Sequence, residues 1–129
     1  AAHPGIRRLG HLEEPDFTTA IGAIDCCVNL RYPAAGETSG IAIRMMGAGK
    51  PVIVTDCEEN ADIPATACLR VTPGVAEAAE LFDHMSLVTG FPPIAAEVGR
   101  QAARHIREQH SLETAARRYW EVLCASASA

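Results

Sequence analysis

Long apolar runs and clustered positive charge are both missing from this chain of 129 residues. No apolar stretch approaches the ~20 residues that a membrane-spanning helix needs, and no basic segment followed by an apolar one predicts a signal peptide. Lysine and arginine number 11 against 16 acidic residues, which gives a formal net charge of -5. Because nucleic-acid binding relies on clustered basic side chains, we expect no nucleic-acid partner and no transmembrane segment.

Disulfide and metal-binding patterns are missing as well. The five cysteines contain no Cys-x-x-Cys motif, and Cys26 and Cys27 lie in an apolar run. We therefore expect free thiols in a reducing compartment, which predicts a cytoplasmic protein. The five histidines show no metal-ligand spacing, and the acidic stretch DCEENADIP (residues 56–64) matches no known calcium or magnesium loop. The sequence predicts neither a metal site nor a cofactor.

What is present is typical of one globular domain. Hydrophobic residues make up 48% and charged residues 21%, and a chain of this length can bury a substantial core. Apolar runs bounded by turn residues predict buried strands at 25–30, 51–55 and 68–71, and residues 6–9 are compatible with a further short strand. The run PVIVT at 51–55 has three successive β-branched residues without polar alternation, which indicates a strand buried in a parallel sheet.

The spacing of apolar residues predicts helices between and after these strands. The predicted helices cover residues 16–23, 39–48, 75–88, 94–109 and 110–124. Thr38 or Ser39 can cap the second of them, and Gly49 ends it. The closing helix at 110–124 is expected to bury one apolar face, made of Leu112, Ala115, Ala116, Tyr119 and Leu123. This order of elements predicts an α/β fold, a Rossmann-like parallel sheet flanked by helices and ending in a helical run.

The stretch GETSG, residues 36–40, lies where the second predicted helix begins. The first turn of a helix has unpaired N–H groups and a partial positive charge, so it attracts anions. Gly36 and Gly40 allow a ligand to approach the backbone closely, and Thr38 and Ser39 add hydroxyls that can cap the helix or bind a phosphate oxygen. These are candidate binding residues in a loop that follows a strand, where parallel α/β sheets bind their ligands.

Glu37 and Arg44 complete this candidate site. A carboxylate beside a phosphate repels it, so Glu37 is better suited to neutral hydroxyls such as those of a sugar ring. Arg44 follows seven residues later, about two helical turns, which predicts that both side chains share one helix face. A guanidinium for phosphate and a carboxylate for hydroxyls suit a sugar phosphate or a nucleotide sugar.

The stretch from Ala23 to Asp56 resembles the C-terminal nucleotide-sugar domain of GT-B glycosyltransferases of the retaining, group 1 kind. In that family an aspartate after a helix, a strand, a turn with glutamate and glycine, and Ala-x-Gly-x-Pro-Val-Val follow in order. Here Asp25, the strand after it, the turn at 36–40 and AGKPVIVTD at the end of the stretch take those places. Residues 110–124 are similar to the closing helix of the family.

The resemblance implies roles for individual residues. The turn amides at Thr38, Ser39 and Gly40 would hold the diphosphate of a nucleotide-diphosphate sugar, and Glu37 would contact the transferred sugar as the catalytic residue. The family places a second glutamate on the ribose, further along the helix. When AGKPV anchors the alignment, the two family glutamates fall on Gly36 and Arg44, so Glu37 is displaced by one residue and an arginine replaces the second glutamate.

The resemblance also implies an incomplete enzyme. Residues 1–129 would be a single truncated donor-binding domain, the incomplete C-terminal half of a GT-B enzyme, and an N-terminal acceptor domain would be a missing partner. We therefore expect this chain alone to be inactive in sugar transfer. In the parent enzyme, backbone N–H dipoles and an arginine would stabilise the departing diphosphate without a metal ion.

Other interpretations remain open. GETSG can be an ordinary helix-capping loop. A phosphosugar-binding α/β module without catalysis would use the same hydroxyls, although it would not account for AGKPVIVTD or the closing helix. A third class is a non-catalytic interaction domain with a receiver-like fold, which needs an acidic pocket at the strand ends and finds only Asp56 there.

Overall fold

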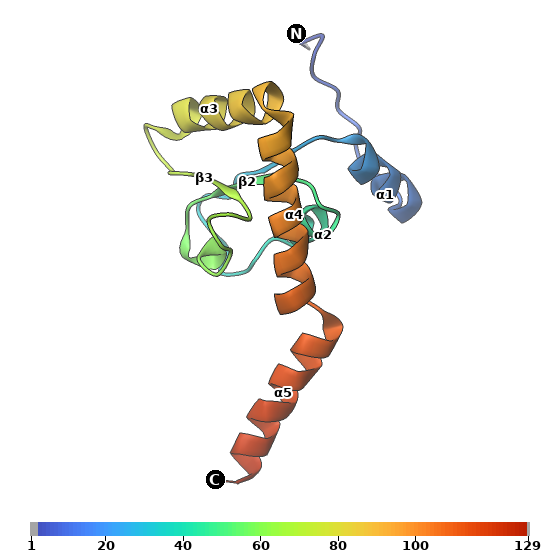
Figure 1. The fold of residues 1–129 in the computed structure, drawn as a ribbon, viewed down its shortest axis with the longest axis vertical. Helices are drawn as coiled ribbons and strands as arrows, with labels where there is room; N and C mark the ends of the chain where they lie inside the picture. Colours follow the sequence, from blue (N-terminus) through green and yellow to red (C-terminus); the bar gives the residue numbers. More distant parts are fainter. Residues whose placement is uncertain (1–2, 129) are drawn as a thin grey trace.

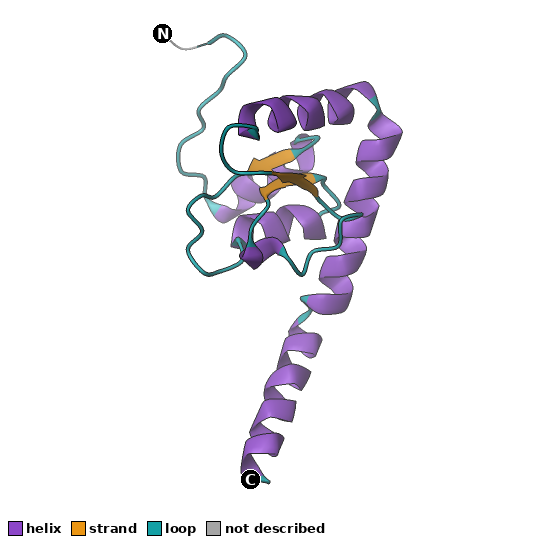
Figure 2. Cartoon of the chain, turned by 90° about the vertical axis from the view of Figure 1, so that its left-hand side faces the viewer, coloured by secondary structure: helices purple, strands orange, loops and turns teal. Residues whose placement is uncertain are grey.

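The centre of the molecule is a small parallel sheet (Figure 2). Its three short strands are β1 (Cys27–Asn29), β2 (Val52–Thr55) and β3 (Leu69–Val71), and they lie side by side in chain order. The computed structural model describes residues 3–128. Cys27 lies opposite Val52 in the first pair of strands, and Ile53 lies opposite Leu69 in the second. Every residue of β2 is buried, as expected for a central parallel strand. The predicted parallel sheet is confirmed.

Helices connect the strands and cover the sheet (Figure 1). They are α1 (Glu14–Ala23), α2 (Gly40–Gly47), the short 3-10 helix η1 (Glu58–Asn60), α3 (Glu77–Gly90), α4 (Pro92–Gln109) and α5 (Leu112–Ala127). α2 packs against β1, β2 and α4, while α3 packs against β3 and α4. α4 therefore packs on both α2 and α3, which cover different strands of the sheet. None of the described helices is long and apolar enough to cross a lipid bilayer.

The hydrophobic core lies between β2 and α2. Met46 of α2 and Val52 of β2 are completely buried there, and Val54 has 1% of its surface exposed. Ile53 is also completely buried, on the opposite face of the sheet. Full burial of one such side chain contributes roughly 1.5–3 kcal/mol relative to leaving it exposed, so a few residues supply much of the driving force. Ala102 of α4 belongs to the same buried cluster, and its small side chain allows the long helix to approach.

A close contact between two backbones joins α2 to α4. Gly49 follows α2 with a φ of 77°, and its N–H donates to the carbonyl of Met46 at 2.9 Å, as in a left-handed helix cap. A Cβ atom added to Gly99 of α4 would lie 2.1 Å from the carbonyl oxygen of Gly49. Only glycine fits at position 99, and the predicted helix end at Gly49 is confirmed.

The N-terminal segment differs from the sequence-based expectation. Ile6–Leu9 forms no strand and extends away from α1 (Figure 1), with Ile6 73% exposed. Its apolar residues are compatible with a strand, but no strand within residues 3–128 lies beside it to supply backbone hydrogen bonds.

The last helix forms as predicted but is not buried. Ser111 caps α5, and its hydroxyl accepts a hydrogen bond from the N–H of Thr114 at 3.1 Å. The expected buried face is exposed: Leu112, Tyr119 and Leu123 are 88%, 75% and 62% exposed. Figure 1 shows α5 extending away from the rest of the molecule. The apolar periodicity identifies one face of this helix, but no other part of residues 3–128 covers it.

Candidate functional site

The loop between β1 and α2, residues 30–39, lies at the carboxyl end of the sheet. Ser39 is the N-cap of α2, and its hydroxyl accepts a hydrogen bond from the N–H of Ala42 at 3.3 Å. Gly40 is the first residue of the helix. The N–H groups of Gly40 and Ile41 donate to no acceptor within residues 3–128. The N–H groups of Thr38 and Ser39 also donate to no acceptor among these residues. The site thus offers four backbone donors at a helix N-terminus, where the helix dipole favours a negative charge.

Arg31 is the second residue of this loop, and a hydrogen bond holds its backbone in place. Its N–H donates to the hydroxyl of Thr55 at 2.8 Å, and Thr55 is 1% exposed at the end of β2. The Arg31 guanidinium lies 3.6 Å from a carboxylate oxygen of Glu37, measured from Nη2 to Oε1. The Arg31 side chain is 35% exposed and that of Glu37 is 74% exposed, so this ion pair lies at the surface of the loop.

Glu37 and Arg44 do not share a helix face, contrary to the sequence-based expectation. α2 begins at Gly40, so Glu37 lies in the loop before the Ser39 cap and helical spacing does not apply to it. Arg44 forms an ion pair with Glu14 of α1, and its guanidinium carbon lies 4.6 Å from the centroid of the Phe17 ring.

Glu59 of η1 closes the loop from the opposite side. Its carboxylate accepts a hydrogen bond from the N–H of Gly36 at 3.1 Å, where Gly36 has a φ of 80°, and its backbone carbonyl accepts one from the Thr38 hydroxyl at 3.3 Å. Hydrogen bonds from its own N–H, from the Cys57 thiol and from Gly36, together with the charge of Arg31, lower the pKa of Glu59. The carboxylate is therefore held in its charged form beside the loop.

Little empty space remains between these groups. A cavity of about 10 Å³ lies between the loop and η1, which is the size of a single water molecule. It is lined by Asn29, Arg31, Ala34, Ala35, Glu37, Ser39, Cys57, Glu59 and Asn60. Larger hollows of about 430 Å³ beside Lys50 and about 420 Å³ beside Tyr119 lie on other parts of the surface. A ligand of this loop would therefore bind on its outer surface or would move the loop.

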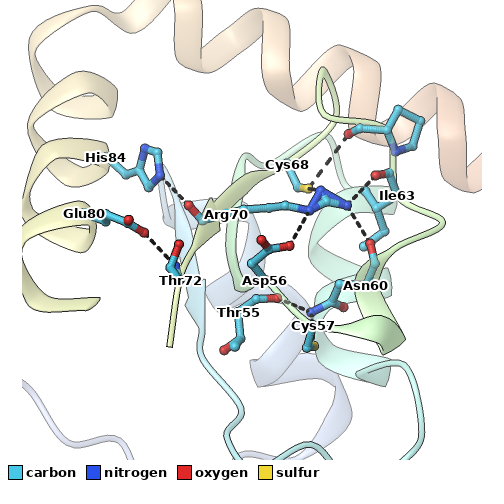
Figure 3. A network of polar contacts seen from close by, with 11 residues as sticks. Thr55, Asp56, Cys57, Asn60, Ile63, Cys68, Arg70, Thr72, Glu80 and His84 are labelled. Atoms are coloured by element: carbon cyan, nitrogen blue, oxygen red, sulfur yellow. Dashed lines mark hydrogen bonds and ion pairs between the residues drawn. The ribbon is translucent and has the colours of Figure 1, made fainter. Parts of the chain in front are cut away.

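The connection from β2 to β3 is rigidly held by Arg70 (Figure 3). Its guanidinium donates to the carbonyls of Asn60 and Ile63 at 2.6 and 2.7 Å. It also lies 3.4 Å from the carboxylate of Asp56. The side-chain amide of Asn60 donates to the carbonyl of Thr55 at 2.8 Å. Asp56, which directly follows β2, is thus paired with Arg70. The same contacts hold η1 in the position from which Glu59 contacts the loop.

The cysteines do not gather at this site as a reactive group. All five are free thiols, and burial raises the pKa of the Cys27 and Cys68 thiols. Burial and the neighbouring Cys27 and Asp25 raise the pKa of Cys26 to about 11. Among the described residues, no group of three or more histidine, cysteine, aspartate or glutamate side chains is arranged to hold a metal ion.

Sequence reasoning missed three residues of the loop environment: Arg31, Thr55 and Glu59. Arg31 could have been found, because it follows the predicted strand directly and therefore lies at the carboxyl end of the sheet. The contact between Gly36 and Glu59 joins positions 23 residues apart, and no local pattern indicates it. The structure brings Gly36, Glu37, Thr38, Ser39 and Gly40 together, and it places Arg44 on the side of α1.

Comparison with known proteins identifies the fold. No protein-family model and no curated protein matches this chain. Among solved structures, sucrose-phosphate synthase from Thermosynechococcus elongatus is similar, with a TM-score of 0.69 and 21% sequence identity over 91% of this chain. The chain spans 30% of the length of that synthase chain. The α/β fold is therefore that of part of a GT-B enzyme, as the sequence predicted.

Proposed function

We propose that this chain is the donor-binding part of a glycosyltransferase, which transfers a sugar from a nucleotide-diphosphate sugar to an acceptor. The observation that carries the proposal is the pair of unpaired N–H groups at Gly40 and Ile41, at the carboxyl end of a sheet whose fold matches part of a glycosyltransferase. Ligands of such sheets bind beyond the carboxyl ends of the strands. The acceptor site and the remainder of the donor site would belong to other parts of a longer, cytoplasmic enzyme.

The diphosphate would lie against the first turn of α2. The N–H groups of Gly40 and Ile41 would donate to its oxygens, whereas the hydroxyl of Thr38 already donates to the carbonyl of Glu59. Because these dipoles are already oriented, they stabilise the charge that develops on the leaving diphosphate without reorganisation. Glu37 is exposed beside them and would accept hydrogen bonds from hydroxyls of the transferred sugar. Arg44 is outside this proposed set, because its guanidinium is engaged by Glu14 and Phe17.

An amide-resolved NMR titration with UDP, GDP and their sugar conjugates tests the proposal. We expect shifts confined to residues 36–41, and the tighter ligand identifies the base. Gly40→Pro is the sharpest variant, because proline is favoured at the first helical position and removes only an unpaired N–H. Ser39 before it has the extended backbone that a following proline requires, with a ψ of 119°.

We expect Gly40→Pro to keep α2 folded and to weaken ligand binding about tenfold, which corresponds to the loss of one hydrogen bond to a charged group. Gly22→Ala in α1 is a matched control, because a Cβ at Gly22 meets no atom within 4 Å. If saturating ligand causes no shifts in this chain and none in a longer parent polypeptide, the transferase proposal is wrong.

A phosphosugar-binding α/β module without catalysis is the second candidate. The exposed carboxylate of Glu37 beside the Thr38 hydroxyl suits any phosphorylated sugar. A hexose phosphate that produces the same shifts at lower concentration than UDP- or GDP-sugars would favour this module over the transferase.

A further inference from the structure

One arginine lies in the loop before α2 and another within the helix, and their surroundings differ. Arg44 lies within the helix, where Glu14 pairs with its guanidinium and the face of Phe17 lies under it. Both partners belong to α1, so Arg44 joins α1 to α2. An arginine that is stacked on an aromatic ring and paired with a carboxylate has its charge and its flat face already satisfied.

Arg31 lies at the mouth of the loop cavity and has weaker partners. Its guanidinium is 3.6 Å from Glu37, beyond the usual length of a hydrogen bond between nitrogen and oxygen. Its backbone, by contrast, is fixed by the 2.8 Å hydrogen bond to Thr55. The positive charge of Arg31 therefore extends from a fixed backbone position, and its guanidinium N–H groups remain available to a ligand.

We propose that Arg31, and not Arg44, is the residue that binds the phosphate groups of the ligand, and that Glu37 orients its guanidinium in the free protein. This inference rests on the proposed function and names the cation of the same site. Arg31 and Ser39 line the same small cavity, so Arg31 lies close to the residue that caps α2, and a phosphate on the outer surface of the loop would be within reach of both. A guanidinium presents parallel N–H donors that match two phosphate oxygens.

The two carboxylates at the loop compete with such a ligand. Glu37 pairs with Arg31, and Glu59 accepts the N–H of Gly36, so an incoming phosphate must approach two negative charges. Removing the charge of Glu59 should therefore strengthen phosphate binding. Glu58 is the matched control, because it is the preceding residue in η1 and its side chain makes no hydrogen bond or ion pair with the loop among the described residues.

Calorimetric titration with inorganic pyrophosphate, UDP and GDP tests the assignment on four variants. We expect Arg31→Ala to weaken binding at least tenfold without lowering the melting temperature. Arg44→Ala should bind within twofold of the unsubstituted chain but melt roughly 2–4 °C lower, because Glu14 and Phe17 of α1 lose their contacts with Arg44. Glu59→Gln should bind several-fold tighter, and Glu58→Gln should bind unchanged.

The outcomes separate the two proposals. Binding that is weakened by Arg44→Ala and not by Arg31→Ala overturns the assignment of Arg31 and leaves the proposed function intact. Equal losses in both variants also overturn it, because the effect would then be one of general charge. An absence of binding by all three ligands, in this chain and in a longer parent, overturns the proposed function together with this inference.

Discussion

The two outer edges of the sheet differ in how their backbone groups are satisfied. At the β3 edge, the carbonyl of Arg70 accepts a hydrogen bond from Nε2 of His84 at 2.7 Å, and the N–H of Thr72 donates to Glu80 at 2.6 Å (Figure 3). Both side chains belong to α3. At the β1 edge, Val28 has no such partner within residues 3–128 and is 45% exposed.

The alternation of a parallel ladder explains why these particular groups face outward. Cys27 of β1 donates to the carbonyl of Pro51 at 3.0 Å, so the N–H and C=O of the next residue, Val28, point away from β2. Arg70 has the corresponding position in β3, because Val71 accepts from Asp56 at 2.8 Å. The ladder geometry therefore leaves outward-facing backbone groups on both edges, and side chains of α3 pair with those of the β3 edge alone among the described residues.

The capped edge and the uncapped edge show where this sheet ends and where another strand can pair. Side chains that cap an edge prevent another strand from pairing there, whereas an uncapped strand without lysine, proline or a bulge is a template for pairing. In doubly wound sheets the strands of one half follow in chain order from the centre outward. β3 is then the outer edge and β1 the inner one, so any further strand would pair with β1.

The largest expected effect comes from proline substitutions in β1. Asn29→Pro removes an N–H that pairs with β2 and should cost about 3 kcal/mol or more of unfolding free energy. Val28→Pro removes an outward N–H and should cost less than about 1 kcal/mol, since proline is tolerated in edge strands where the N–H faces solvent. Urea unfolding followed by circular dichroism measures both. Equal losses would mean that Val28 is already paired.

Arg70→Ala breaks the closed side of the sheet. Its guanidinium is the donor to two backbone carbonyls and the partner of Asp56, and its side chain is 23% exposed. Loss of these contacts should lower the unfolding free energy by roughly 2–3 kcal/mol. Arg107→Ala, an exposed position on α4, is the control and should change it by less than about 0.5 kcal/mol. A small effect of Arg70→Ala would show that the connection from β2 to β3 is stable without this side chain.

Substitutions of the side chains that cap the β3 edge should have a smaller effect on stability. His84→Ala and Glu80→Ala each remove one hydrogen bond from the β3 edge, which should cost about 1 kcal/mol each. The double variant leaves both edges of the sheet uncapped, so we expect it to self-associate at concentrations where the unsubstituted chain does not. Sedimentation velocity at several concentrations measures this. Unchanged sedimentation would contradict the role of α3 in closing the edge.

Local sequence signals predicted the centre of the fold. The β-branched run of β2, a cap at Thr38 or Ser39 and the helix end at Gly49 each have a physical reason that involves only neighbouring residues. The structure has the strand and Gly49 where they were expected, and Ser39 is the cap. The relation between Glu37 and Arg44 was predicted wrongly, because it depended on which residue caps the helix. With Ser39 as the cap, Glu37 falls outside the helix.

The remaining differences come from contacts that sequence patterns do not contain. An apolar stripe shows which side of a helix can be buried but not whether another element is present to cover it, so α5 was expected to be buried and is exposed. The edge caps at His84 and Glu80 and the contact of Glu59 with Gly36 join separate elements. They follow from the folded arrangement and not from spacing along the chain.

α5 protrudes from the rest of the molecule, and this affects how the molecule tumbles in solution. The helix has 16 residues, so it extends about 24 Å along its axis. A body with such an arm tumbles anisotropically: rotation about the long axis is faster than end-over-end rotation. Amide relaxation rates along α5 should therefore differ from those of β2 because their N–H bonds are oriented differently to the long axis, even where both segments are equally rigid.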